Sequence, residues 1–112
     1  MHLEAAMAGE ALVVRVEEAR LDAACAIQFK DRMREIAGAA PPRVILDLAR
    51  VGFVDSSGLG AIVAVMKFLA PARRLELAGL TPNVAKVFHL TRMDTVFTIH
   101  AALPGGAMAH GD

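Results

Sequence analysis

The chain has 112 residues, the size of one domain with one hydrophobic core. Twelve Lys and Arg balance twelve Asp and Glu, so the chain lacks the net positive charge on which nucleic-acid binding and electrostatic membrane attachment depend. Five Phe with no Trp or Tyr also leave few flat rings for stacking on bases or sugars.

No feature of the sequence indicates export. A single cysteine, Cys25, cannot form an intrachain disulfide. The opening residues lack the basic and apolar regions of a signal peptide, and no apolar run approaches the roughly 20 residues of a membrane helix. We therefore expect a cytoplasmic protein without nucleic-acid or membrane partners.

Two strands open the predicted fold. Residues 3–8 are weakly strand-like, and residues 11–16 concentrate the β-branched side chains that favour strands. A turn at residues 8–10 would pair the two strands.

A helix is predicted from Asp22, which is placed to cap it. Apolar side chains at intervals of four, four and three share one face of this helix: Cys25, Phe29, Met33 and Ile36. The glycine and two prolines of residues 38–42 end it. Because Cys25 lies on the inward face, we interpret it as a core residue and not as a redox site.

Strands and helices alternate through the rest of the chain. The predicted elements are strands over 43–48, 74–78 and 95–99 and helices over 57–70 and 83–91. This alternation predicts a single α/β domain with a mixed, mostly parallel sheet of about five strands and three main helices. We expect the domain to span residues 1–100 and a flexible tail to span residues 101–112, with a C-terminal helix that is short or absent.

No catalytic or metal-binding motif is complete. The four histidines are scattered without a metal-ligand spacing. Gly58 and Gly60 lack both the third glycine of a dinucleotide fingerprint and the lysine of a phosphate-binding loop. Ser57 has neither the flanking glycines of a hydrolase nucleophile nor a visible base. We therefore expect a non-enzymatic protein without a metal or cofactor.

The segment between residues 53 and 60 concentrates polar groups at the start of a helix. Asp55, Ser56 and Ser57 follow the end of a strand and precede the helical pattern. Asp55 or Ser56 is suited to accept hydrogen bonds from the first-turn amides. The hydroxyls are thereby held beside unpaired backbone N–H groups.

The helix that follows is apolar around most of its circumference. A core stripe is predicted from Leu59, Ile62, Val63 and Met66. A second apolar face comprises Ala61, Ala64, Val65, Phe68 and Leu69. A helix of this kind is either fully buried or presents its second face to a partner, and we favour the partner.

These residues together resemble a bacterial STAS domain of the anti-anti-sigma factor (anti-sigma factor antagonist) type. The resemblance runs from about residue 3 to residue 100. It rests on the Leu21-Asp22 pair, the Asp55-Ser56-Ser57-Gly58 turn and the entry to the third helix at residues 80–83. Ala19 and Arg92 stand where the family usually has glycine.

The resemblance implies a partner-switching pathway that regulates transcription. Ser57 would be phosphorylated by a serine kinase that is also an anti-sigma factor, an ATP-binding protein with a histidine-kinase-like ATPase fold. The unphosphorylated form would bind this kinase and release the sigma factor, and a PP2C-type phosphatase would restore it. The expected contact residues are Asp22, Asp55, Ser56, Ser57, Gly58, Leu59, Ala61, Val65 and Phe68.

Two alternatives remain open at this stage. The protein could be an accessory subunit of a transport or signalling assembly. In that case the same helix would dock constitutively and Ser57 would be purely structural. Alternatively, the amides of residues 56–58 could hold phosphate in a small nucleotide-binding α/β protein.

Overall fold

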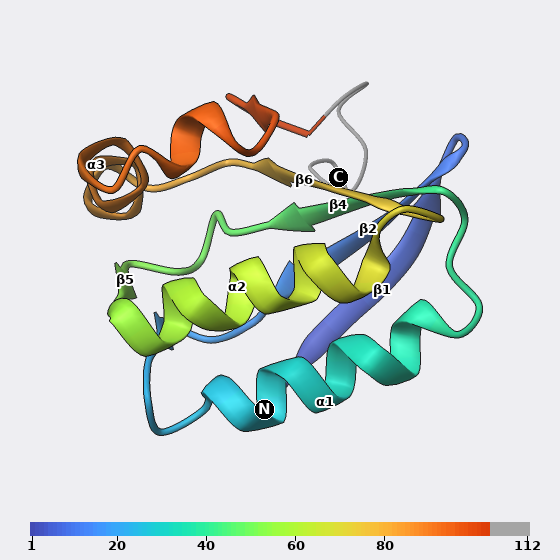
Figure 1. The fold of residues 1–112 in the computed structure, drawn as a ribbon, viewed down its shortest axis with the longest axis horizontal. Coiled ribbons are helices and arrows are strands. Elements are labelled where there is room, and N and C mark those ends of the chain that lie inside the picture. The colour runs from blue at the N-terminus through green and yellow to red at the C-terminus, as the bar shows by residue number, and fades with distance from the viewer. Residues whose placement is uncertain (104–112) are drawn as a thin grey trace.

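A computed structural model describes residues 1–103, and its main sheet has the strand order β1-β2-β4-β6-β7 (Figure 1). The antiparallel β1–β2 hairpin lies at one edge, and the other neighbouring strands pair in parallel. The strands are β1 (Leu3–Ala8), β2 (Ala11–Val16), β4 (Arg43–Asp47), β6 (Arg74–Ala78) and β7 (Ile99–His100). The predicted class, an α/β domain around a mixed five-stranded sheet, is confirmed.

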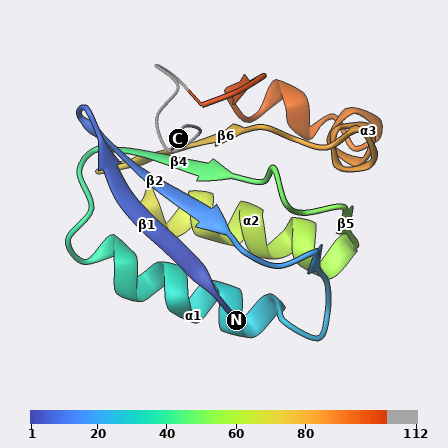
Figure 2. The same cartoon turned by 180° about the vertical axis from the view of Figure 1, so that it is seen from behind.

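Within residues 1–103, three α-helices accompany the sheet, as predicted: α1 (Ala26–Ala37), α2 (Ser56–Leu69) and α3 (Pro82–Leu90). Helices α1 and α2 lie side by side on one face of the sheet, in front of it in Figure 1 and behind it in Figure 2. Helix α3 packs next to β5 (Phe53–Val54), which pairs in parallel with β3 (Arg20–Leu21) in a separate two-stranded sheet.

The main core lies between the sheet and helices α1 and α2. Side chains alternate between the two faces of each strand. Val14, Leu46 and Leu77 therefore point from three adjacent strands into one cluster with Phe29 of α1 and Ile62 of α2, and all five are fully buried. Burying each such side chain stabilises the fold by roughly 1.5–3 kcal/mol.

A smaller apolar cluster covers part of the opposite sheet face. Val13, Ile45 and Ala78 are buried there together with Leu103. The packed part of the chain thus continues beyond residue 100, where we expected the tail to begin. The remainder of the expected tail, residues 104–112, lies outside the described residues, as does any C-terminal helix there.

Helix α1 begins four residues later than predicted. The Asp22 carbonyl accepts hydrogen bonds from the backbone N–H groups of Cys25 (3.1 Å) and Ala26 (2.9 Å), and its carboxylate accepts one from Ala24 N–H (3.1 Å). Asp22 therefore organises a separate turn before the helix instead of capping it. Cys25 is half-buried and packs against the main core, as its inward position suggested.

The last predicted strand, over residues 95–99, is shorter and later in the structure. A 3₁₀ turn at Met93–Thr95 precedes it, and only Ile99 and His100 join the sheet as β7. Arg92 adopts a left-handed φ of 61° at the end of α3, and the Thr95 hydroxyl donates to its carbonyl at 2.7 Å. Glycine adopts this left-handed backbone without steric cost, so the φ of Arg92 is strained in a way that a glycine at this position would not be.

A buried carboxylate anchors the outer face of the sheet. Glu76 is only 1% exposed. Its oxygens accept hydrogen bonds from Arg43 (3.0–3.2 Å), Arg74 (2.9 Å) and His100 (2.7 Å). Burial raises the pKa of Glu76, but the hydrogen bonds from Arg43, His100 and Arg74 outweigh it and bring the pKa from 4.5 down to about 2.

Replacing this carboxylate tests its contribution to stability. Because the pKa of Glu76 is lower in the folded state, its stabilisation is complete above pH 4.5 and is lost as the pH falls toward 2. Glu76→Gln should lower the free energy of unfolding at pH 7 by on the order of 3 kcal/mol and flatten the acid limb of the stability profile. Urea titrations across this pH range measure both effects. Glu10→Gln, in the exposed β1–β2 turn, is the control, and an unchanged acid limb in Glu76→Gln would contradict the assignment.

Candidate functional site

The turn between β5 and α2 exposes two hydroxyl groups at a helix N-terminus. Asp55 caps α2, with its Oδ1 accepting a hydrogen bond from Gly58 N–H at 2.8 Å, so one of the two predicted capping residues is confirmed. Ser56 and Ser57 are the exposed first residues of the helix. Within residues 1–103, no hydrogen bond engages the Ser57 hydroxyl. This hydroxyl is therefore open to a modifying enzyme.

The same carboxylate joins this turn to the loop before α1. The second oxygen of Asp55 accepts a hydrogen bond from Ala23 N–H at 3.2 Å, and Asp55 N–H donates to the Leu21 carbonyl at 3.2 Å. The β3–β5 pairing places Leu21 opposite Val54 just before this contact. The loop before α1 that contains Asp22 (the Asp22 loop) and the turn that contains Asp55, Ser56 and Ser57 (the serine turn) thus form one surface.

Gly58 is the point of closest approach between the two loops. A Cβ atom at this position would lie 2.0 Å from the Leu21 carbonyl oxygen, a distance that no real contact tolerates. Gly58 is buried. It therefore serves loop packing, and we correct its expected role as a partner contact.

An arginine and an aromatic ring that the sequence analysis missed border the same surface. Arg20 Nε donates to Asp22 Oδ2 at 3.1 Å, and its guanidinium lies 4.1 Å from the centre of the Phe53 ring. The hydrogen bond from Arg20 lowers the pKa of Asp22, which keeps this carboxylate ionised. Phe53 is 40% exposed. The two residues face each other in the β3–β5 register, but strands of two residues leave no periodic signal in a sequence.

The predicted partner face along α2 is largely buried. Ala61 and Val65 are only 3% and 0% exposed, so their assignment to a partner surface is wrong. Phe68 is half-buried beneath the Arg34 guanidinium of α1, 4.3 Å from its ring centre. Because α2 packs against both the sheet and α1, it buries two adjacent faces, and this packing explains its all-round apolar character. Leu59 is half-buried beside the serine turn.

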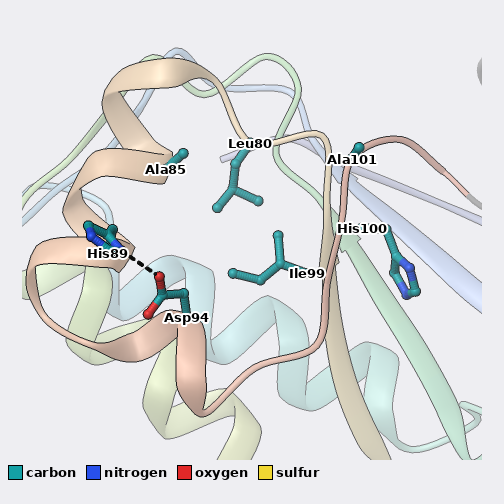
Figure 3. A pocket seen from close by; sticks show the side chains of 7 residues that line it. All are labelled: Leu80, Ala85, His89, Asp94, Ile99, His100 and Ala101. Carbon is teal, nitrogen blue, oxygen red and sulfur yellow. Dashed lines mark hydrogen bonds and ion pairs between the residues drawn. The ribbon is translucent and has the colours of Figure 1, made fainter.

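A cavity of about 560 Å³ lies elsewhere, between α3 and β7 (Figure 3). Leu80 and Ile99 point into it, and His89 Nδ1 lies 2.9 Å from Asp94 Oδ2 on its wall. None of its lining residues carries a hydroxyl, thiol or primary amine, and none belongs to the serine turn. The cavity is therefore separate from the surface around Ser57.

The described part of the chain, residues 1–103, offers neither a cluster of metal-binding side chains nor a membrane-spanning helix. No group of three or more His, Cys, Asp or Glu side chains is arranged to hold a metal ion. Among the helices of this part of the chain, none is both long enough and apolar enough to cross a bilayer.

Comparison with known proteins identifies relatives over nearly the whole chain. The STAS domain family model matches residues 2–104. BtrV of Bordetella bronchiseptica, which is named as an anti-sigma factor antagonist, is 32% identical over 68 residues. That match covers 60% of this chain and 59% of BtrV.

Solved structures share the fold. An anti-sigma factor antagonist from Mycobacterium paratuberculosis matches with a TM-score of 0.82 at 22% identity, covering 99% of this chain and 94% of that one. The antagonist SpoIIAA in its unphosphorylated form matches with a TM-score of 0.67 at 25% identity, covering 98% of this chain and 97% of SpoIIAA. The murine anion transporter Slc26a9 matches with a TM-score of 0.65 at 19% identity, covering 72% of this chain and 14% of the transporter.

Two glycines of α2 give a matched test of the loop contact. Gly58→Ala should lower the free energy of unfolding by roughly 1–3 kcal/mol, because the new Cβ forces the loops apart. Gly60→Ala should raise it by roughly 0.5–1 kcal/mol, because its Cβ meets no atom within 4 Å and the helix gains intrinsic stability. Chemical denaturation of both variants measures the difference. Equal effects would mean that the loops do not meet at Gly58.

Proposed function

Because this chain belongs to the STAS domain family, we propose that it is an anti-sigma factor antagonist switched off by phosphorylation of Ser57. In its unphosphorylated form it binds a serine kinase that is also an anti-sigma factor, and this binding releases the sigma factor. A PP2C-type phosphatase returns the phosphorylated protein to the binding form. The protein acts in this pathway by binding and not by catalysis.

The exposed Ser57 hydroxyl at the N-terminus of α2 carries the proposal. A kinase can reach it without unfolding the domain, because it is exposed and is not hydrogen-bonded within the described chain. A phosphate there adds a charge of about −1.5 to −2. The helix N-terminus tolerates this charge, which stabilises such a site by roughly 0.3–1 kcal/mol. Modification therefore changes the surface and leaves the fold intact.

Electrostatics supply the switch. Asp55 and Asp22 lie on the same surface, where Arg20 offsets one of the two negative charges, so a phosphate adds to a net negative charge. A partner that buries the neutral hydroxyl would have to desolvate an anion instead. One like-charge contact at about 4 Å costs on the order of 4 kcal/mol at an effective dielectric constant near 20. Reversing an occupancy from 99:1 to 1:99 takes about 5.5 kcal/mol, which one phosphate with acidic neighbours can approach.

The docking surface is smaller than the sequence indicated. We assign it to the residues that surround the serine turn and remain at least partly exposed: Asp22, Phe53, Asp55, Ser56, Ser57, Leu59 and Gly60. Phe53 is its aromatic centre, held in place by Arg20. Aromatic side chains at the centre of an interface commonly contribute most to binding.

The relatives support this role. BtrV and the Mycobacterium protein are named as anti-sigma factor antagonists. SpoIIAA, described as a Bacillus cell fate determinant, has also been solved in a phosphorylated form, which matches this chain with a TM-score of 0.66 at 24% identity. The likeness to the transporter extends to the fold alone.

Incubation with the cognate kinase and ATP tests the site of modification. Mass spectrometry should find one phosphate on Ser57, none on Ser57→Ala, and normal labelling of Ser56→Ala, which removes the adjacent hydroxyl. Ser57→Asp should weaken kinase binding at least about tenfold while the circular dichroism spectrum is unchanged. Unchanged binding by Ser57→Asp would instead favour a constitutive accessory subunit. Micromolar ATP or GTP binding by the isolated protein would favour the nucleotide-binding alternative.

A second variant tests the docking surface independently of phosphorylation. Phe53→Ala should weaken binding of the unphosphorylated protein to the kinase by about tenfold or more, with little loss of folding stability. Val96→Ala is the matched control, because Val96 is 48% exposed but lines a surface with Met66 and Ala70 at the other end of α2. Isothermal titration calorimetry compares them. Equal affinities would remove Phe53 from the interface.

A further inference from the structure

In the described part of the chain, strand β1 leaves the outer edge of the main sheet open. It pairs with β2 on one side and is the terminal strand of the sheet on the other. In Figure 2 no other element lies in front of it. Residues 4–7 are all exposed, and Met7 is 58% exposed. An edge of this kind is a template for pairing with another strand unless something blocks it.

The β1–β2 register identifies the backbone groups that point outward. Glu17 N–H donates to the His2 carbonyl at 3.0 Å, so this pair is hydrogen-bonded. In an antiparallel ladder, bonded and non-bonded pairs alternate. Leu3, Ala5 and Met7 therefore belong to non-bonded pairs and direct their N–H and C=O groups away from β2. Among residues 1–103, no group pairs with this outer edge.

The edge lacks the usual protection against self-association. Natural edges commonly carry lysine, proline, a bulge or inward charges. Strand β1 has the sequence Leu-Glu-Ala-Ala-Met-Ala, with one charge, no proline and three alanines. The formal net charge of the chain is zero, so two copies do not repel each other through their overall field.

We propose that β1 pairs with β1 of a second copy of this chain, antiparallel and centred on Ala5. This register is the one that pairs the three outward residues among themselves, Ala5 with Ala5 and Leu3 with Met7. It places Glu4 opposite Ala6 of the other copy. A register centred on Glu4 would place two carboxylates directly opposite each other, which is destabilising.

The dimer joins two five-stranded sheets into one continuous sheet. The interface comprises only one short strand from each copy. Because such an interface buries a small area, the association should be weak and reversible. None of the residues assigned to kinase docking lies on β1, so dimerisation and kinase binding use separate surfaces.

Sedimentation velocity of the full chain, from micromolar to millimolar concentration, tests the dimer. A reversible monomer–dimer equilibrium is expected. Ala5→Pro should abolish it, because proline removes an outward N–H and leaves the β1–β2 ladder intact. Circular dichroism must show that Ala5→Pro is still folded. A wild-type chain that stays monomeric at every concentration overturns the proposal.

A matched pair of charge variants tests the register. Ala6→Lys faces Glu4 of the other copy and should tighten the dimer several-fold at low salt. Ala6→Glu places two carboxylates opposite each other and should weaken it several-fold. Both changes lie on an exposed side chain, so folding is unaffected. Equal dissociation constants for the two variants overturn the Ala5-centred register, and Ser57→Asp should leave dimerisation unchanged.

Discussion

One carboxylate, that of Asp55, holds together the surface on which the proposed function depends. One of its oxygens caps α2 through Gly58 N–H, and the other accepts Ala23 N–H from the loop before α1. A single side chain therefore fixes both a helix start and the relative position of two distant loops. Since Gly58 lacks a side chain, the backbone of α2 can pack directly against the Leu21 carbonyl. Ser57 is consequently displayed on a rigid support.

The parallel arrangement of the sheet explains why these loops meet at all. Strands β3 and β5 pair in parallel, so the segments that follow them emerge at the same edge. Sites on α/β domains commonly form in this way, at the carboxyl ends of parallel strands. The surface combines an exposed ring, Phe53, with two carboxylates and a hydroxyl. It is suited to binding a protein and to losing that affinity when a phosphate is added.

The two faces of the main sheet divide structural tasks. The face beneath α1 and α2 is apolar throughout, whereas the other carries Glu76 with its three cationic or imidazole partners. A buried carboxylate is costly unless its hydrogen bonds are complete, and here they are. The charged cluster lies between β4, β6 and β7, so it holds the last, very short strand onto the sheet. Within residues 1–103, by contrast, no group closes the edge of β1.

The sequence by itself determined the order of most elements, the α/β class, the Asp55 cap and the position of Ser57 at a helix start, because each follows from local periodicity or turn chemistry. Only the tertiary structure decided which side of α2 is buried. An all-round apolar helix has no preferred face until α1 and the sheet enclose it, and they enclose Ala61 and Val65. Tertiary packing also decided the Arg20–Phe53 contact and the late start of β7, because both depend on backbone pairing between residues far apart in the chain.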